Sequence, residues 1–513
     1  MTFRSGPLRN YAVFFCIALA LAALSAPASA VTKKKVAATN KKPAHSQPAA
    51  THGKKAITTS RKTAATSRTS RSVPSKRGNV VVVSRGKAGK KTRIPRTLRT
   101  VPVSPVVREN AADRVEQTLT ETSSSPFIFP NSLHAFFKAL HAEQSNRNPS
   151  QGDLSPGTVR ILQFGDSHTA ADIFTGDMRS HMQQQFGDGG LGFQFPGHPF
   201  AGYHIVGSLR SQSEGWLTEG NHFLQLGDGD LGLGGISIST SQPGQSITLE
   251  TTCTTLQLHF LQQPGGGKLQ FTDNGTAISD IDTNTDGASR AGTFTYSCTA
   301  GQHDFAFTTL ERAPVKLLGI VTEQPGVTYE CLGINGAVAP LMLRWNQSLF
   351  ADYLRQRDPA LIVLAYGTNE ASGSSDRLET YQADFERLLD NLHRITPGAS
   401  ILVLGPEDRS IASHRSWRPF AGIDRIIAFQ KEACRLHGCT YWDTRRRMGG
   451  FGSMQQWVAA GWAQPDRTHL TGTGYRALAG ALYTDLMHAY NLYEQHSDTA
   501  VEESRNGKAP RNY

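Results

Sequence analysis

Short runs of apolar and β-branched residues recur along the chain and predict buried strands. They cover 159–164, 327–332, 360–366, 400–405 and 439–443, and the last four are separated by segments with helical periodicity, such as 376–395. Strands that alternate with helices in this way form βαβ units, whose parallel sheet is covered on both faces. The pattern therefore predicts an α/β fold of the flavodoxin-like, doubly wound type.

Two further segments carry apolar residues at helical spacing. Residues 130–144 open with Pro-Asn-Ser, which is typical of a helix start, and residues 468–490 form the last periodic segment. We expect the folded body to begin at about residue 126 and to end near 490, followed by a disordered tail over 491–513.

One long interval interrupts the alternation of strands and helices. About 160 residues separate the first apolar run from the second, and 205–325 alternate polar and apolar residues in short runs divided by Gly, Pro, Asn and Asp. These runs are 235–240, 246–252, 256–262, 268–273, 292–297 and 303–310. They predict an all-β sandwich domain inserted between two parts of the α/β domain, 126–204 and 326–490. Carbohydrate binding and a purely supporting role are both open for this insert.

The first thirty residues have the pattern of a secretory signal peptide. Two arginines precede an apolar core of about fourteen residues, and Ala28-Ser29-Ala30 forms a small-residue cleavage site. The core is shorter than the ~20 residues that a membrane-spanning helix needs. We therefore predict export, a mature chain that begins at Val31, and a periplasmic or envelope location.

Charge is concentrated in the segment that follows the signal. Residues 31–108 hold 21 Lys and Arg and no Asp or Glu, whereas the whole chain has a net charge of +11, which leaves 109–513 at −12. The segment is also poor in aromatic residues, so it cannot bury enough apolar surface to fold. We predict a basic disordered arm over 31–125. Contact with anionic envelope polymers or lipid head groups and a role as a solvated spacer are both open, and no nucleic-acid partner is expected after export.

Five cysteines remain once Cys16 is removed with the signal. Cys253 and Cys298 lie in the β-rich insert, and Cys434 and Cys439 flank a short helix-to-strand turn. Two local disulfides are therefore plausible in an oxidising compartment. Cys331 is left over, in an apolar run where a small buried residue is expected.

Candidate chemistry begins where the first strand ends. Gly165-Asp166-Ser167-His168 follows the run 159–164, and Asp466 and His469 stand three residues apart just before the last helix. A serine, a histidine that takes its proton and an aspartate that orients the histidine are the parts of a nucleophilic catalyst. The chain is therefore interpreted as a serine hydrolase with Ser167, Asp466 and His469 as its catalytic residues.

Two other strand ends carry loops of similar type. They are Gly333-Ile334-Asn335-Gly336 and Gly367-Thr368-Asn369-Glu370. Because ligands bind beyond the carboxyl ends of parallel strands, we expect these loops to meet Ser167 in one crevice. Asp166 and His168 are expected to bond within the turn that presents Ser167, and Glu370 to face solvent or substrate.

Each of these residues also has an ordinary structural explanation. Taken alone, Ser167 fits a strand-to-helix cap, Asn369 a turn residue, and Asp466 with His469 the first turn of the last helix. Their joint occurrence at strand ends favours catalysis. No His, Cys and carboxylate pattern with zinc spacing, no phosphate-binding loop and no dinucleotide fingerprint is present, so no metal and no cofactor are expected.

The four blocks GDSH, GINGA, GTNEA and DRTH resemble the Ser, Gly, Asn and His blocks of the SGNH hydrolase superfamily, the GDSL-like esterases, and they occur in that family's order. The resemblance covers roughly 280 residues outside the insert. GDSH lacks the second glycine of the G-x-S-x-G elbow, which disfavours an α/β-hydrolase fold. The segments FGDSHTAADIFTG, FGDGGLGF, GINGA and YWDTRRRMGG further resemble bacterial peptidoglycan O-acetylesterases with an inserted carbohydrate-binding-like β-domain.

The resemblance implies a role for each block. Ser167 matches the nucleophile, His469 the general base and Asp466 its orienting residue, while the oxyanion hole comprises the N–H of Ser167, the N–H of Gly336 and the side chain of Asn369. The activity implied is removal of 6-O-acetyl groups from N-acetylmuramyl residues of peptidoglycan through an acetyl-Ser167 intermediate. A polysaccharide O-acetyltransferase, an esterase for another acylated glycan or lipid, and a protein that mainly binds the cell wall are the alternatives.

Overall fold

A computed structural model provides the fold of the chain. It describes residues 103–121, 126–146, 157–220, 226–372, 375–414 and 416–505. The predicted signal peptide over 1–30 and the basic arm as far as residue 102 lie outside the described residues.

The predicted apolar runs form a parallel sheet. Its strands are β2 (Thr158–Gly165), β12 (Gly326–Gly333), β13 (Leu361–Ala365), β14 (Ser400–Leu404) and β17 (Thr440–Trp442), with a short antiparallel edge strand β1 (Phe127–Ile128) that no sequence pattern indicated. The spatial order is β1-β17-β14-β13-β2-β12. Numbered along the chain, the parallel strands follow the order 2-1-3-4-5 of flavodoxin-like folds, which confirms the predicted fold class.

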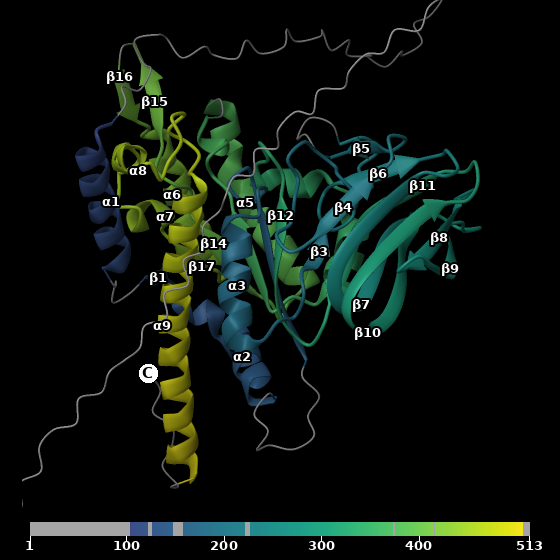
Figure 1. The fold of residues 1–513 in the computed structure, drawn as a ribbon. Coiled ribbons are helices and arrows are strands. Elements are labelled where there is room, and N and C mark those ends of the chain that lie inside the picture. Colours follow the sequence, from purple (N-terminus) through teal and green to yellow (C-terminus); the bar gives the residue numbers. More distant parts are fainter. Residues whose placement is uncertain are drawn as a thin grey trace, which may run out of the picture. The chain divides into compact units, whose positions relative to one another are not determined.

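Both faces of the sheet are covered. In β2, Leu162 and Phe164 belong to one apolar core, whereas Val159 and Ile161 belong to the other. The first core is closed by α4 (Gln347–Arg357), α5 (Ser375–Ile395) and α6 (Gly422–His437), and the second by α2 (His134–Asn146), α3 (Phe174–Phe186), α8 (Met454–Ala460) and α9 (Gly472–Arg505) (Figure 1). Short turns η2 (Pro130–Leu133), η3 (Ala339–Arg344), η4 (Glu370–Ser372) and α7 (Thr444–Arg447) connect these elements.

The predicted disorder is wrong over part of the basic arm. Helix α1 (Pro105–Thr120) begins at Ser104, whose side chain accepts a hydrogen bond from the Val107 N–H, and Pro105 occupies its first turn. Ala111 and Val115 are buried in the second core. The composition of the whole arm concealed these two apolar positions, which lie one helical turn apart.

The predicted tail is also wrong from residue 491 to 505, because α9 continues to Arg505. The Tyr493 ring contacts Phe137 and His134 of α2 with centroids 5.8 and 5.5 Å apart. Glu494 pairs with His141 at 3.1 Å. Contacts with α2 therefore support the helix beyond the predicted end of the folded body, and Figure 1 shows α9 running alongside α2 and α3. Residues 506–513 lie outside the described part.

The insert is an antiparallel β domain, as predicted, but its strands form a single sheet. They are β3 (Gly192–Gln194), β4 (Leu209–Gln212), β5 (Leu217–Glu219), β6 (Ser237–Thr240), β7 (Ser246–Gln262), β8 (Lys268–Asp273), β9 (Thr276–Asp282), β10 (Arg290–Thr309) and β11 (Val315–Glu323). The sheet begins with β3, before the expected boundary at 205.

Two long strands explain why there is one sheet instead of two. The runs predicted at 246–252 and 256–262 merge into β7, and those at 292–297 and 303–310 merge into β10. A register shift between Ser297 and Gly301 bends β10. Phe271 of β8 consequently contacts Phe294 and Tyr296 in the first half of β10, at 5.2 and 5.1 Å between centroids. The bent sheet thus encloses a core as a sandwich does.

Two of the candidate disulfide cysteines lie at this register shift. Cys253 lies opposite Gly301 in the ladder, and Cys298 stands in the shifted stretch. Their Sγ atoms are 3.7 Å apart, and both are free thiols, so the structure contains no Cys253–Cys298 disulfide. Cys434 and Cys439 are joined by a disulfide at the end of α6, and Cys331 is buried.

Strand β11 attaches the insert to the catalytic sheet. Leu317 and Ile320 point into the core of the insert, whereas Leu318 and Val321 pack into the core that α4 and α5 close over the parallel sheet. A strand buried on both faces has no solvated side, and all nine residues of β11 are buried. The insert therefore shares an apolar core with the catalytic domain.

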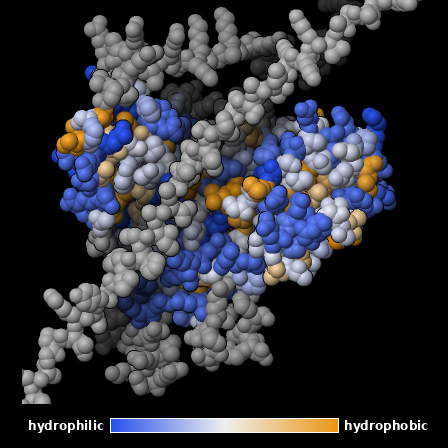
Figure 2. Space-filling model, viewed as in Figure 1, coloured by the Kyte–Doolittle hydropathy of each residue, from blue (hydrophilic) through white to orange (hydrophobic). Residues whose placement is uncertain are grey.

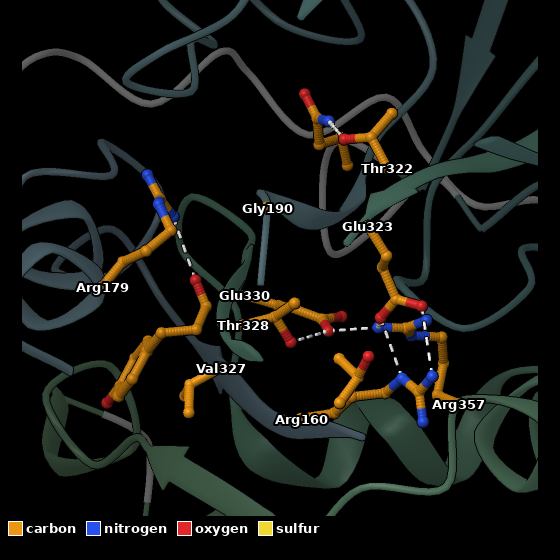
Figure 3. A network of polar contacts seen from close by, with 12 residues as sticks. Arg160, Arg179, Gly190, Thr322, Glu323, Val327, Thr328, Glu330 and Arg357 are labelled. Atoms are coloured by element: carbon orange, nitrogen blue, oxygen red, sulfur yellow. Dashed lines mark hydrogen bonds and ion pairs between the residues drawn. The ribbon is translucent and has the colours of Figure 1, made fainter. Parts of the chain in front are cut away.

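Buried charges reinforce this junction (Figure 3). Glu323 at the end of β11 accepts hydrogen bonds from Arg160 of β2 at 2.8 Å and from Arg357 of α4 at 2.7 Å. Arg357 also pairs with Glu330 of β12. Burial alone would raise the pKa of Glu323, but Arg357 and Arg160 lower it to about 2. Glu323 therefore remains ionised, and its bonds connect the insert with the sheet and with α4.

Figure 2 shows one face of the molecule, coloured by hydropathy. On the face shown in Figure 2, hydrophobic residues gather in small, separate patches within a mainly hydrophilic surface. Exposed apolar side chains include Val206, Leu209 and Leu217 of the insert. Within the described part of the chain, no helix combines the length and apolar character that crossing a bilayer requires.

The charge network predicts a large effect of one substitution. Arg357→Met leaves the Glu323 and Glu330 carboxylates buried without their shared partner, so we expect the free energy of unfolding to fall by about 3–5 kcal/mol. Urea denaturation would measure the change. Arg355→Met, which removes an exposed pair with Asp352 on the same helix, should cost less than about 0.5 kcal/mol. Equal losses in the two variants would contradict the assignment.

A second prediction concerns His259 of β7. Its ring stacks on Tyr353 of α4 at 4.4 Å, and neither ring nitrogen has a hydrogen-bond partner among the described residues. Burial lowers the pKa of His259 to about 3. In the unfolded chain His259 binds a proton below pH ~6.5, whereas in the folded chain it stays neutral down to about pH 3. The free energy of unfolding therefore falls as the pH drops across this window.

His259→Phe keeps the stacked ring and removes the titration. Between pH 7 and pH 5 we expect the variant to lose about 2 kcal/mol less stability than the unmodified protein. Urea titrations at both pH values provide the measurement, with exposed His204→Phe as the control. An unchanged pH dependence in His259→Phe would show that the buried ring is not the group responsible.

Candidate active site

The four sequence blocks meet at one edge of the parallel sheet. Ser167 follows β2, Gly336 follows β12, Asn369 follows β13, and Asp466 with His469 stands in the loop before α9. The Ile334 N–H donates to the Gly165 carbonyl at 3.0 Å, which joins the ends of β12 and β2. The convergence expected from the strand order is therefore present.

Ser167, His469 and Asp466 form a connected row. Ser167 Oγ lies 2.9 Å from His469 Nε2, and His469 Nδ1 lies 2.7 Å from Asp466 Oδ2. The other carboxylate oxygen, Asp466 Oδ1, accepts the backbone N–H groups of Thr468 and His469. The aspartate is thus fixed by its own loop and holds the imidazole toward the serine, which is the geometry of a nucleophile with its general base.

A tight turn presents Ser167. Asp166 Oδ1 accepts the His168 N–H at 2.9 Å, as expected, and the Asp166 carbonyl accepts the N–H groups of Thr169 and Ala170. At Gly165 a Cβ would lie 2.1 Å from Thr169 Oγ1, so no side chain fits where the chain leaves the sheet. The turn is specified by its glycine and by the buried aspartate.

Gly336 stands in a turn of its own. The Ala337 N–H donates to the Ile334 carbonyl at 3.0 Å, and Gly336 has φ of 76°, a conformation that glycine adopts without strain. Among the described residues, neither the Gly336 N–H nor the Ser167 N–H has a hydrogen-bond partner. Two backbone donors are therefore available at the edge where an oxyanion would form.

Asn369 links three of the loops. Its Nδ2 donates to Asp166 Oδ2 at 3.2 Å and to the Ala337 carbonyl at 2.9 Å. The side chain lies between the Ser167 turn and the Gly336 turn, as the strand order requires. Because both amide hydrogens are engaged, donation to an oxyanion requires Asn369 to exchange one of these partners.

A second polar group behind the triad was not identified from the sequence. His168 stacks on His469 with ring centroids 5.2 Å apart, and its Nδ1 lies 3.1 Å from the Tyr475 hydroxyl and 3.4 Å from Glu407 Oε1. Glu407 comes three residues after the last residue of β14, Leu404, so the rule used for the other strand ends could have found it. Tyr475 belongs to α9 and carried no such signal.

Burial sets the protonation states of this group. Burial raises the pKa of Asp166 to about 6 and that of Glu407 to about 7, and it lowers the pKa of His168 to about 4. His168 is therefore neutral at pH 7. It stacks on the catalytic imidazole without adding a positive charge of its own.

The pKa values of His469 and Asp466 shift in the opposite directions to those of His168 and Asp166. The hydrogen bond that His469 donates to Asp466 raises the pKa of His469, against the effect of its partial burial. Burial alone would raise the pKa of Asp466, but its bonds to His469 and Thr468 lower it to about 2. An ionised aspartate thus stabilises the protonated imidazole, which is the state that His469 reaches after it takes the serine proton.

Glu370 does not face solvent or substrate as expected. The side chain is buried, and its carboxylate accepts the N–H groups of Ala339 and Gly367 at 2.8 and 3.0 Å. It joins the Asn369 loop to η3, so its role is to position that loop. Within the described residues, no cluster of His, Cys, Asp and Glu could hold a metal ion.

Comparison with known proteins agrees with this geometry. Residues 297–477 match the GDSL-like Lipase/Acylhydrolase family. A solved structure described as "Peptidoglycan O-acetylesterase in action, 5 min" is 26% identical, with a TM-score of 0.58, and the match covers 70% of this chain and 96% of that one. No curated protein matches by sequence.

A more distant structure is a family two carbohydrate esterase from Cellvibrio japonicus. It is 12% identical with a TM-score of 0.24, and the match covers 55% of this chain and 98% of the other. At that TM-score it adds nothing to the assignment. The sheet order, the row from Ser167 to Asp466 and the matches to the GDSL-like family and to the O-acetylesterase structure together support an SGNH hydrolase that is similar to the peptidoglycan O-acetylesterases.

Proposed function

We propose that the protein removes O-acetyl groups from peptidoglycan, at the 6-O-acetyl esters of N-acetylmuramyl residues. The observation that carries the proposal is the row Ser167–His469–Asp466 at 2.9 and 2.7 Å, in a chain that resembles a peptidoglycan O-acetylesterase over most of its folded part. The inserted β domain agrees with a polymeric substrate, because such inserts occur in enzymes that act on polysaccharides.

The first half of the reaction transfers the acetyl group to the enzyme. Ser167 Oγ attacks the acetyl carbonyl carbon while His469 Nε2 takes the serine proton. The oxyanion that forms is stabilised by the free N–H groups of Ser167 and Gly336, joined by Asn369 when its amide turns from Asp166. The C–O bond to the sugar then breaks, and the sugar oxygen leaves with the proton held by His469.

The second half repeats these steps with water. His469 takes a proton from a water molecule, which attacks the carbonyl carbon of acetyl-Ser167. The tetrahedral intermediate collapses, Ser167 recovers its proton from His469, and acetate leaves. Asp466 remains ionised throughout and keeps His469 in the tautomer that points Nε2 at the serine.

Export and attachment complete the proposal. The signal pattern over 1–30 would bring the enzyme to the envelope, where its substrate is found. The basic segment 31–108 would then hold the enzyme near anionic polymers or lipid head groups through its excess of Lys and Arg. Both parts rest on sequence pattern alone.

Ser167→Ala tests the central step. Because the nucleophile is lost while the fold is kept, we expect acetate release from O-acetylated peptidoglycan to fall by at least about 10³-fold. Ser348→Ala, at an exposed position on α4, is the matched control and should retain full activity. De-O-acetylated wall gives the background.

Three outcomes would redirect the proposal. Near-normal acetate release by Ser167→Ala would exclude the covalent mechanism. Ser167-dependent hydrolysis of a small acetyl ester with no release from the wall would keep the esterase chemistry and move the substrate to another acylated glycan or lipid. Transfer of acetyl to an added glycan, in place of acetate release, would identify a transferase.

The pH dependence tests the role of Asp466. His469 acts as a base only when neutral, and its pKa is raised by Asp466, so kcat/KM for a small acetyl ester should reach half its maximum above pH 6.5. In Asp466→Asn this acid limb should shift to lower pH, and the plateau should fall by about 10³–10⁴-fold. Asp352→Asn on α4, where the side chain is 43% exposed, is the control. A limb that stays in place would assign the titration to another group.

A further inference from the structure

A β-hairpin stands beside the catalytic loop at the carboxyl end of the parallel sheet (Figure 1). Its strands are β15 (Ser410–Ser413) and β16 (Ser416–Pro419), and it follows β14. The Ser410 N–H donates to the Arg467 carbonyl at 3.0 Å, and Arg467 lies between Asp466 and His469 in the chain. The hairpin is therefore hydrogen-bonded directly to the loop that carries two triad residues.

Arg467 is held by an aromatic ring and not by an acid. Its Cζ lies 5.0 Å from the centroid of the Trp417 ring on β16. Among the described residues the guanidinium has no ion pair, and its Nε is buried without a hydrogen-bond partner. Burial lowers the pKa of Arg467, and no acidic group opposes that shift. A positive charge thus stands next to the triad with its donors unused.

The backbone of Arg467 is also unusual. Its φ of 56° lies in the left-handed region, which costs a side-chain-bearing residue energy. A glycine or asparagine would adopt this conformation more readily, yet the position carries a long cationic side chain. Strain of this kind persists where the surrounding structure fixes it, and here the Ser410 bond and the Trp417 ring do so.

Arg409 provides a contrast within the same site. Its Nη1 donates to the Thr368 carbonyl and to Ser372 Oγ, both at 2.9 Å, and its Cζ lies 5.1 Å from the Phe420 ring. Burial lowers its pKa, while the charges of Asp466 and Asp166 act in the opposite direction. Arg409 therefore offsets the acidic groups of the active site, and Arg467 has no such task.

We infer that Arg467, oriented by Trp417, forms a subsite for a carboxylate of the substrate. The inference rests on the proposed function for the identity of that substrate. A muramyl residue carries its peptide on the same sugar ring as the 6-O-acetyl ester, so carboxylates of the peptide accompany the scissile group. The ligand assigned to the subsite is therefore a carboxylate of this glycan-linked peptide.

The chemistry of the pair fits this ligand. A guanidinium presents donors in a planar fork that matches the two oxygens of a carboxylate. Stacking on an indole fixes the plane of the fork and leaves its edge free. A neutral sugar would gain little from such an unpaired charge, whereas a carboxylate would satisfy donors that no described residue satisfies.

Arg467→Gln tests the subsite because it keeps the length and polarity of the side chain and removes the charge. The substrates are an O-acetylated muropeptide with free carboxylates, the same compound with its carboxylates amidated, and a small acetyl ester. A charge-assisted bond is strong enough that kcat/KM for the free-carboxylate substrate should fall roughly 10–100-fold more than that for the other two. The change should appear mainly in KM.

Matched variants separate the subsite from general damage. Arg418→Gln removes a positive charge from the residue that follows Trp417. Arg418 is exposed and lies on the opposite face of the hairpin from Trp417, so this variant should leave the discrimination between substrates unchanged. Trp417→Phe retains a ring beneath Arg467 and should retain most of the preference for the free-carboxylate substrate. Trp417→Leu should lose this preference, as Arg467→Gln does. Equal losses on all three substrates would mean that Arg467 acts through the triad, and this would overturn the inference.

Binding to Ser167→Ala distinguishes failure of the subsite from failure of the proposed function. Calorimetry with a de-O-acetylated, free-carboxylate muropeptide requires no turnover, and affinity should fall roughly 10–100-fold when Arg467→Gln is added. Arg467-dependent binding without acetate release from the wall would support the subsite and contradict the proposed function. Acetate release with binding and turnover independent of Arg467 would leave the esterase intact and overturn the subsite.

Discussion

The active site depends on one topological constraint, that parallel strands bring all their carboxyl ends to the same edge of a sheet. Ser167 and His469 are 302 residues apart in the chain, yet their reacting atoms lie 2.9 Å apart. Burial of β2 on both faces fixes where Ser167 emerges, and the final helix fixes the loop that returns His469. The chemistry of the triad is therefore a product of sheet packing, and no local segment could form it.

Much of this arrangement could be predicted from residue patterns. The apolar runs identified all five parallel strands. The residue types at the end of the first strand pointed to Ser167, and those before the last helix pointed to Asp466 and His469, which the structure brings into contact with it. Strand periodicity found the β insert but divided β7 and β10, because a polar stretch inside a long strand looks like a turn. It could not show that both halves of each strand stay hydrogen-bonded in one bent sheet.

The features that were missed depend on contacts between distant segments. The sequence suggested that Glu370 is a surface residue after a turn, but its carboxylate accepts hydrogen bonds from backbone N–H groups of two loops. Helix α9 extends past its apolar stripe because Tyr493 meets α2, and α1 is stabilised by two buried positions, Ala111 and Val115, that directly follow the basic segment 31–108. Composition averages such positions away, and only the folded chain shows which few of them make contacts.

The attachment of the insert has a consequence for how the chain can evolve and be dissected. Strand β11 contributes side chains to two cores, and Glu323 shares Arg357 with Glu330 of the catalytic sheet. Excision of the insert would therefore expose apolar surface and leave buried charges without their partners. The two parts should melt as one cooperative unit, and neither can be exchanged as a module. Because the insert and the catalytic domain share a core, any ligand bound to the insert would lie at a fixed distance from Ser167.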